Sequence, residues 1–397
     1  MRKTSVGTRA VRGDPTDVLR LLFDRREWTR AELARATSLS RSTIVLRLDA
    51  LRDVGLVREV GRLSPEGGRP TTKLALNDRV RTVAGIELGH SSCRVTIADL
   101  GAKPLAQTSL PIAHTDGYEH ILNGIVDTLR RLLSDTAEEH GDLAAVTLGL
   151  PMSATLGAVG LIRTGGAKGW MGFPAREWLE TELAVPVQLE NDVNLMVLGE
   201  RIEAFPEVAD LLLVHVADGV GAAAVAGGNL VRGAANLAGE IAHVPALRRN
   251  DELCLCGNRG CLGAVATLPA VLSTLRREGR QAENLDDLMQ LVARGDFIAA
   301  RTLRQAGRDV GDVLVYSISS TNPQVLVLSG SLAFAGDHFI AGVRESLYSS
   351  GPPALTDGLQ VVRSMKPAGS GTRGALQIAA EQVLSGDSLV ALLEESA

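Results

Sequence analysis

The chemistry that this sequence supports most clearly is metal binding by clustered cysteines. Cys254, Cys256 and Cys261 lie within eight residues, and His243 lies a short distance upstream. Thiolate sulfur and imidazole nitrogen are the preferred ligands of zinc, and four of them close a tetrahedral structural site. Two glycines between Cys256 and Cys261 permit the tight turn that brings the sulfurs to one ion. The alternative is a chance cluster of buried cysteines, but Cys93 is the only other cysteine in the chain, so we expect structural zinc.

The same segment resembles the signature of the ROK family, which is named for repressors, open reading frames and kinases. The matching residues are Gly239, Glu240 and His243, followed by the run of three cysteines at 254–261. The resemblance extends from about residue 81 to the C-terminus. It implies that the histidine and the three cysteines hold a structural zinc ion. It also implies that Glu240 and His243 reach the hydroxyl groups of a bound sugar.

Length and composition indicate a soluble protein of two or three domains. The chain has 397 residues, of which 45% are hydrophobic but only 3% aromatic, so its cores must consist mainly of aliphatic side chains. No apolar run reaches the roughly 18 residues that a membrane span needs. The basic start lacks the apolar core of a secretory signal. Cysteines gathered at one metal site also suit a reducing compartment, so we expect a cytoplasmic protein with no membrane partner.

The charge of the chain is divided unevenly. Residues 1–79 contain 17 Lys and Arg against 10 Asp and Glu, whereas the remaining residues contain 24 against 36. A small basic head on a large acidic body suggests that the head meets a polyanion. The alternative is a chance imbalance over a short segment.

The basic head is predicted to begin with a helix-turn-helix. Apolar spacing predicts helices at 15–23, 30–36 and 41–53. Thr29 and Glu32 form a capping box before the second helix, and Ser40 is suited to cap the third. Two short helices joined by a tight turn are the geometry that places a recognition helix in the major groove of DNA.

The exposed face of the third helix is predicted to contact DNA. It offers Arg41, Ser42, Thr43 and Arg47, whose hydroxyl and guanidinium groups suit both phosphates and base edges. The alternative is an ordinary three-helix packing unit with a solvated basic face.

A β-hairpin is predicted after the third helix. Strands at 56–60 and 72–76 enclose a glycine-rich loop, which makes the head a winged helix. Residues 67–70 resemble the wing of ROK repressors. Arg69 in this loop could enter a narrow minor groove, where the potential is most negative. The alternative is a mobile turn with an arginine that has no role.

The rest of the chain is predicted to be an α/β body. Strands alternate with helical stretches, as in layered α/β proteins. The predicted strands are 81–89, 93–99, 144–150, 187–190, 210–216 and 324–329. The resemblance implies an actin-like ATPase (ribonuclease H-like) architecture, with two lobes and a ligand cleft between them. The expected division is a head at 1–79, a first lobe at 80–195 rejoined by a C-terminal helix at about 372–397, and a second lobe at 196–371 carrying the zinc site and a dimerisation surface.

The elements that bind nucleotide in related kinases are altered here. The first phosphate turn, with an Asp and a Gly-Gly-Thr in the kinases, corresponds to Glu87 through Ser91 and contains His90. The second has Asp218 where the kinases have a hydroxyl residue, and a third glycine pair is reduced to Gly330 after a serine. A backbone cradle for phosphate needs free N–H groups and no competing negative charge. We therefore expect that phosphotransfer has been lost and that the protein is not an enzyme.

The sugar side of the kinase motif is better preserved. Asn191 and Asp192 match the kinase motif in which Asp is the base that deprotonates the attacking hydroxyl. Without ATP, Asp192 is a vestigial base but still a hydrogen-bond acceptor, so the expected ligand contacts are Asn191, Asp192, Glu240 and His243. Gly263 stands where the family commonly has a sugar-binding Glu, which favours a modified or bulkier ligand. The alternative for Asn191 and Asp192 is a turn cap after the preceding strand.

These features predict a transcriptional regulator, most simply a repressor controlled by a sugar or sugar derivative. It would bind double-stranded DNA as a homodimer, with each head reading one half-site; a tetramer is the alternative. One alternative is an active sugar kinase with a DNA-binding head. Another is a regulator that answers to a protein partner. His215 and the other histidines outside the metal cluster are expected to be packing or surface residues.

Overall fold

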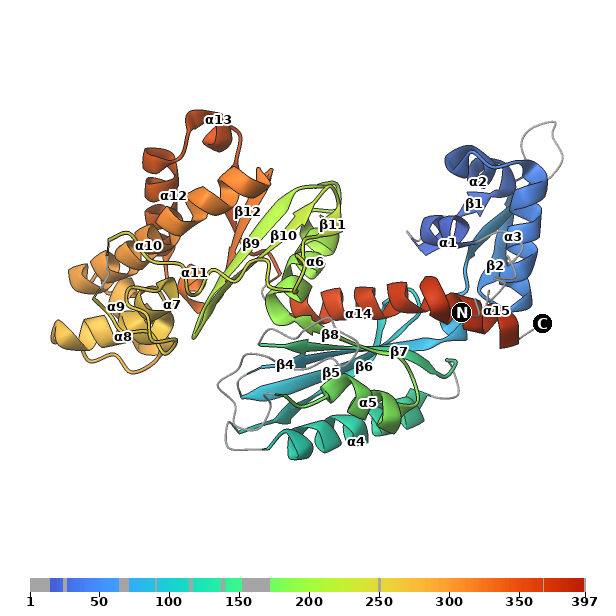
Figure 1. The fold of residues 1–397 in the computed structure, drawn as a ribbon, viewed down its shortest axis with the longest axis horizontal. Helices are drawn as coiled ribbons and strands as arrows, with labels where there is room; N and C mark the ends of the chain where they lie inside the picture. The colour runs from blue at the N-terminus through green and yellow to red at the C-terminus, as the bar shows by residue number, and fades with distance from the viewer. Residues whose placement is uncertain are drawn as a thin grey trace, which may run out of the picture.

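The structure, a computed structural model, has a small head and two α/β lobes (Figure 1). The described residues are 15–23, 27–63, 71–89, 91–113, 117–136, 140–151, 172–248, 251–366 and 368–395. Two residues singled out from the sequence, Arg69 in the wing and His90 in the first phosphate turn, lie outside these ranges. None of the described helices is both long and apolar enough to cross a bilayer.

The head consists of three helices and a small antiparallel sheet. Its helices are α1 (Thr16–Phe23), α2 (Arg30–Thr37) and α3 (Arg41–Asp53), and its antiparallel sheet has the order β1 (Trp28–Thr29), β3 (Thr71–Leu76) and β2 (Val57–Leu63). The predicted capping box is confirmed, because Thr29 and Glu32 exchange hydrogen bonds at the start of α2. Ser40 caps α3 by accepting from the backbone N–H of Thr43. These caps fix where each helix begins, and the spacing of Ile44, Leu48 and Leu51 sets the buried face of α3.

The first lobe is a five-stranded sheet covered by helices on both faces. Its strands, in spatial order, are β6 (Pro104–Pro111), β5 (Ser92–Asp99), β4 (Thr82–Leu88), β7 (Leu143–Leu150) and β8 (Val187–Asn191). Helices α4 (Tyr118–Thr136) and α5 (Ala175–Leu183) cover one face, and α14 (Ser370–Val383) packs on β4 and β7 across the other (Figure 1). Strands β4, β7 and β8 are parallel, so the residues that follow them meet at one edge.

The second lobe has a similar sheet. Its strands, in spatial order, are β11 (Asn229–Leu230), β10 (Val220–Ala226), β9 (Leu211–Val216), β12 (Val325–Ser329) and β13 (Gln360–Arg363). Its helices are α7 (Leu262–Val265), α8 (Leu268–Arg277), α9 (Leu285–Ala293), α10 (Phe297–Thr321), α11 (Ser331–Phe334), α12 (Asp337–Ser350) and α13 (Pro353–Thr356). The long helices α10 and α12 pack against each other (Figure 1).

Two helices join the lobes. Helix α6 (Asp192–Ala204) follows β8 and packs on β9 and β10 of the second lobe, and it also packs along α14 of the first. The two helices approach so closely that a Cβ atom on Gly199 would lie 1.9 Å from the carbonyl oxygen of Ser370. A Cβ atom on Gly374 would lie 2.0 Å from that of Leu195. The lobe boundary expected at residue 195 therefore falls inside α6, a helix that packs against both lobes.

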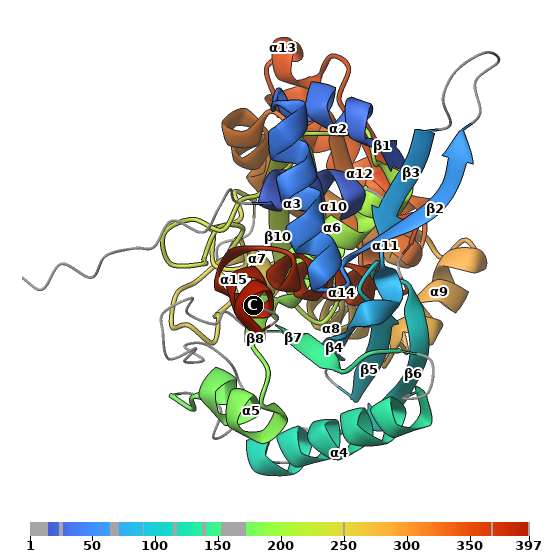
Figure 2. The same cartoon turned by 90° about the vertical axis from the view of Figure 1, so that its right-hand side faces the viewer.

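The head shares a hydrophobic core with the C-terminus of the body. Leu19 and Leu48 from the head cluster with Leu376 of α14 and with Leu389 of α15 (Gly386–Glu395), and all four are buried. Figure 2 shows α15 beside the lower end of α3. The head and the body are consequently joined by side-chain packing as well as by the chain that connects them.

Candidate functional site

A pocket of about 260 Å³ lies at the predicted ligand cleft between the lobes. Its wall combines the end of β8 and start of α6, the turn between β9 and β10, and the segment 236–240. Asn191, Asp192 and Glu240 all line it, so the structure brings three of the four predicted ligand contacts together. The described lining does not include His243, whose ring instead faces the cysteines.

Asn191 has a structural role at the pocket. Its side-chain oxygen caps α6 by accepting hydrogen bonds from the backbone N–H groups of Val193 and Asn194, at 3.0 and 3.4 Å. The turn-cap alternative is thus confirmed for this residue. Only the amide nitrogen of Asn191 is left to act on a ligand, and the residue also lines the pocket.

Glu190, which sequence reasoning did not select, organises the wall behind the pocket. Its side chain is fully buried and accepts hydrogen bonds from Arg232 at 2.7 Å and from the Asn194 amide nitrogen at 2.8 Å. A buried carboxylate needs such partners, because an unpaired charge in the interior is very unfavourable. Its position one residue before the Asn-Asp pair was the available signal. Glu190 therefore fixes the start of α6 and the pocket side chains on it.

Asp192 and His215 have pKa values moved by burial in the pocket. Burial raises the pKa of Asp192 to about 7, and the negative charges of Glu87 and Glu240 add to the rise while the backbone N–H of Val193 opposes it. Burial lowers the pKa of His215 to about 4, against a smaller opposite effect of Asp218. His215 lines the pocket, a position that the sequence did not indicate. It is the next-to-last residue of β9, the middle strand of its sheet.

The two turns that the resemblance to kinases assigned to phosphate binding each have a carboxylate. Glu87 accepts hydrogen bonds from Thr372 at 2.6 Å and from Arg94 at 3.2 Å, so its carboxylate is already bonded to two side chains of the protein. Asp218 is exposed at the turn between β9 and β10 and lines the pocket. Both positions place negative charge where a phosphate group would need donors.

The four predicted metal ligands form one cluster. The ligand atoms of His243, Cys254, Cys256 and Cys261 all lie within 4.8 Å of one another. The Sγ atoms of Cys256 and Cys261 are 3.7 Å apart, and the Sγ of Cys254 is 3.5 Å from Nδ1 of His243. Standard zinc bond lengths in a tetrahedral site give separations of about 3.8 and 3.6 Å for these two kinds of pair. The donor set and its spacing therefore fit a tetrahedral metal ion.

The metal loop turns where the sequence predicted. Gly257 and Gly260 both have positive φ angles, 91° and 70°, which side chains rarely adopt. Burial raises the pKa of the Cys261 thiol to about 12, and the neighbouring thiols add to the rise. The backbone N–H of Asn258 is the main cause of the lowered pKa of Cys256. A metal ion would have to displace these thiol protons, because thiolates are the ligands.

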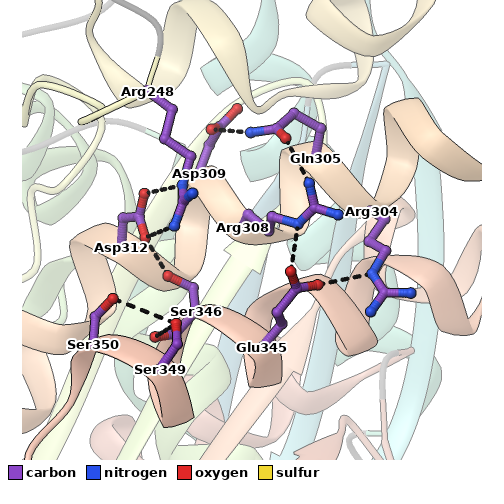
Figure 3. A network of polar contacts seen from close by, with 10 residues as sticks. All are labelled: Arg248, Arg304, Gln305, Arg308, Asp309, Asp312, Glu345, Ser346, Ser349 and Ser350. Atoms are coloured by element: carbon purple, nitrogen blue, oxygen red, sulfur yellow. Dashed lines mark hydrogen bonds and ion pairs between the residues drawn. The ribbon is translucent and has the colours of Figure 1, made fainter.

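A second anchor holds the loop to the helices behind it (Figure 3). Arg248, just before the cysteines, donates two hydrogen bonds to Asp312 on α10, at 2.7 and 3.1 Å. The Asp312 side chain is 2% exposed and also accepts from the hydroxyl of Ser346 on α12. This ion pair joins the metal loop to the α10–α12 pair.

Replacing Arg248 by Met is expected to lower the free energy of unfolding by about 2 kcal/mol, because the buried Asp312 loses its cation. Thermal and urea unfolding measure the change. The matched control is Arg304→Met in the same network, whose partner Glu345 is 41% exposed and is also contacted by Arg308. The Arg304→Met substitution should lower the free energy of unfolding by less than about 1 kcal/mol. Equal effects of the two substitutions would contradict the anchoring role of Arg248.

The exposed face of α3 differs from the predicted one. Arg41 and Ser42 are exposed, and Thr43 is half-buried. Arg47 is not on this face: its side chain is only 12% exposed and forms a 2.9 Å ion pair with Asp17 of α1. The prediction that Arg47 lies on the exposed face was therefore wrong, because the pattern did not reveal the acidic partner on another helix.

The family model of the ROK family matches residues 83–382, and the chain belongs to this family. The N-acetylglucosamine repressor of Escherichia coli O6:H1 is 25% identical over 389 residues, which are 95% of this chain and 94% of the relative.

Two solved structures confirm the predicted fold. A ROK family transcriptional regulator, described as a homologue of the E. coli MLC protein, superposes with a TM-score of 0.83 at 20% identity and covers 96% of this chain and 99% of its own. The ROK hexokinase of Thermus thermophilus has a TM-score of 0.66 at 27% identity and covers 77% of this chain and 100% of its own. The kinase thus matches most of this chain, whereas the regulator matches nearly all of it.

Proposed function

We propose that this protein is a transcriptional regulator, most simply a repressor, that binds DNA through its head and a sugar or sugar derivative in its cleft. The observation that carries the proposal is the packing of a helix-turn-helix head against a kinase-like body whose pocket gathers Asn191, Asp192 and Glu240. Carboxylate and amide groups of this kind accept and donate hydrogen bonds to sugar hydroxyls. Arg41, Ser42, Thr43 and, in the wing, Arg69 are the proposed DNA contacts.

We further propose that the body has lost phosphotransfer. Glu87 is held by Thr372 and Arg94, and Asp218 adds a second carboxylate at the phosphate end of the pocket. Asp192 then serves as a sugar contact and not as a catalytic base. ATP consumption with any sugar of a test panel, abolished by Asp192→Asn, would restore the kinase alternative.

We propose that zinc is the ion of the metal site and that it acts through structure. His243 lies three residues after Glu240, so an ion held by His243 and the cysteines would stiffen the segment that lines the pocket. The protein is proposed to be cytoplasmic and to bind DNA as a homodimer, because two heads reading two half-sites require a two-fold assembly.

The decisive test is a fluorescence-anisotropy titration of the zinc-loaded protein on DNA from upstream of its own gene, with and without a panel of sugars. Selective, salt-dependent binding that one sugar alters is the expected result. Selective binding that no sugar alters would instead favour control by a protein partner. A ligand can change DNA binding only if it prefers one conformation of the regulator.

A further inference from the structure

Two large apolar side chains lie exposed on α3. Val45 is 38% exposed and Leu46 is 47% exposed, whereas Ile44, Leu48 and Leu51 of the same helix are fully buried. The core of the head is thus complete without Val45 and Leu46. Two adjacent exposed aliphatic side chains on this helix are thus free to contact a partner.

The position of the pair identifies the kind of partner. Arg41 and Ser42 precede Val45 and Leu46 by one helical turn, so all four residues share one face of α3. Arg30 and Arg35 of the preceding helix are also exposed. Residues 1–79 as a whole carry 17 basic against 10 acidic side chains. The apolar pair is therefore set in a positively charged head, which fits duplex DNA better than another apolar protein surface.

The chemistry of the major groove limits which bases Val45 and Leu46 could recognise. Val and Leu side chains have no hydrogen-bond donor or acceptor, so they cannot pair with the polar base edges. The only methyl group that the four base pairs present in the major groove is the C5-methyl of thymine. We propose that Val45 and Leu46 read thymine methyl groups, so that each operator half-site has A·T pairs under the middle of α3. This inference rests on the proposed DNA-binding function.

The test removes the methyl groups from the DNA and leaves all else in place. The operator is first selected from random duplexes with the full-length, zinc-loaded protein. Each thymine of the selected half-site is then replaced by uracil, and affinity is measured by fluorescence anisotropy. Burial of one methyl group corresponds to about a fourfold change in affinity, so uracil at one or two positions should weaken binding about fourfold each.

Variants of the protein assign the effect to the two side chains. In Val45→Ala and Leu46→Ala proteins, the difference between thymine and uracil should disappear at the position that each side chain contacts. Both residues are exposed, so unchanged thermal unfolding is expected to accompany the change. Met289→Ala is the matched control, because Met289 is 42% exposed but lies on α9 of the second lobe. Arg41→Ala should weaken both DNAs equally.

Three outcomes would overturn the inference. Selective binding that no uracil substitution weakens would show that thymine methyls are not read. A uracil effect that persists in the Val45→Ala, Leu46→Ala double variant would assign the methyl contact to another residue. Failure to select any sequence would overturn the proposed DNA-binding function, and this inference with it.

Discussion

Replacing Cys261 by alanine is expected to abolish metal binding and to lower the free energy of unfolding by about 4 kcal/mol or more. Cys261 is 1% exposed, and its Sγ lies 3.7 Å from that of Cys256. Removing one of four ligands leaves an incomplete tetrahedral site, and the loop loses the crosslink that closes it. Metal analysis of the purified protein and thermal unfolding with and without a chelator measure both effects. A chelator should destabilise the wild type but leave the variant unchanged.

The control for this prediction is Cys93→Ala. Cys93 is also fully buried, in β5, but among the described residues it belongs to no group of three or more possible metal ligands. Replacing Cys93 by alanine should lower the free energy of unfolding by about 1 kcal/mol, because packing contacts are lost, and should leave the metal content unchanged. A Cys261→Ala protein that retains its metal, or that is destabilised only as much as Cys93→Ala, would refute the assigned metal site.

Effector binding is expected to strengthen as the pH rises through about 7. Burial keeps the Asp192 carboxyl protonated below that pH, and the ionised form is the stronger acceptor for a sugar hydroxyl. Between pH 6 and pH 8 the affinity for the sugar identified in the panel should rise about tenfold. Isothermal titration calorimetry in two buffers of different ionisation enthalpy should show release of a proton on binding near pH 6.5.

The Asp192→Asn variant shows whether the pH dependence of sugar affinity comes from Asp192 or from another titrating group. The variant should bind the sugar about 10- to 100-fold more weakly at pH 8, and its affinity should no longer depend on pH. Asp218→Asn, in the same pocket, should retain the dependence. Because the folded-state pKa of Asp192 is raised from 3.8 to about 7, this group lowers stability progressively as the pH rises between those values. The ligand-free Asp192→Asn protein should therefore be more stable than the wild type at pH 8. A steep pH dependence that survives in Asp192→Asn would contradict the assignment.

The sequence predicted the head and the metal site in detail because their signals are local. The capping box at Thr29 and Glu32 depends on a spacing of three residues, and α3 has the predicted bounds. The metal ligands lie close in sequence, and the φ angles of Gly257 and Gly260 agree with the turn that their residue type suggested. Chemistry that depends on neighbours in the chain can be read from the chain.

Features that depend on distant neighbours could not be predicted in this way. The ion pair between Arg47 and Asp17 joins two helices and leaves the arginine side chain only 12% exposed. The burial of Glu190 depends on Arg232, 42 residues further on. Strand β10 has the sequence Val-Gly-Ala-Ala-Ala-Val-Ala, which is poor in the β-branched and aromatic residues that favour strands. It is nevertheless held in the sheet by pairing with β9 from Val220 to Val225.

The core that the head shares with α14 and α15 limits how the head of this regulator can be separated from its body. A head cut away after residue 79 would be separated from Leu376 and Leu389, which belong to the same cluster of buried residues as Leu19 and Leu48. Exchanging heads between regulators of this family would therefore require the C-terminal helices to be exchanged with them. In evolutionary terms, we expect the first and the last segments of the chain to change together, because both contribute to one core.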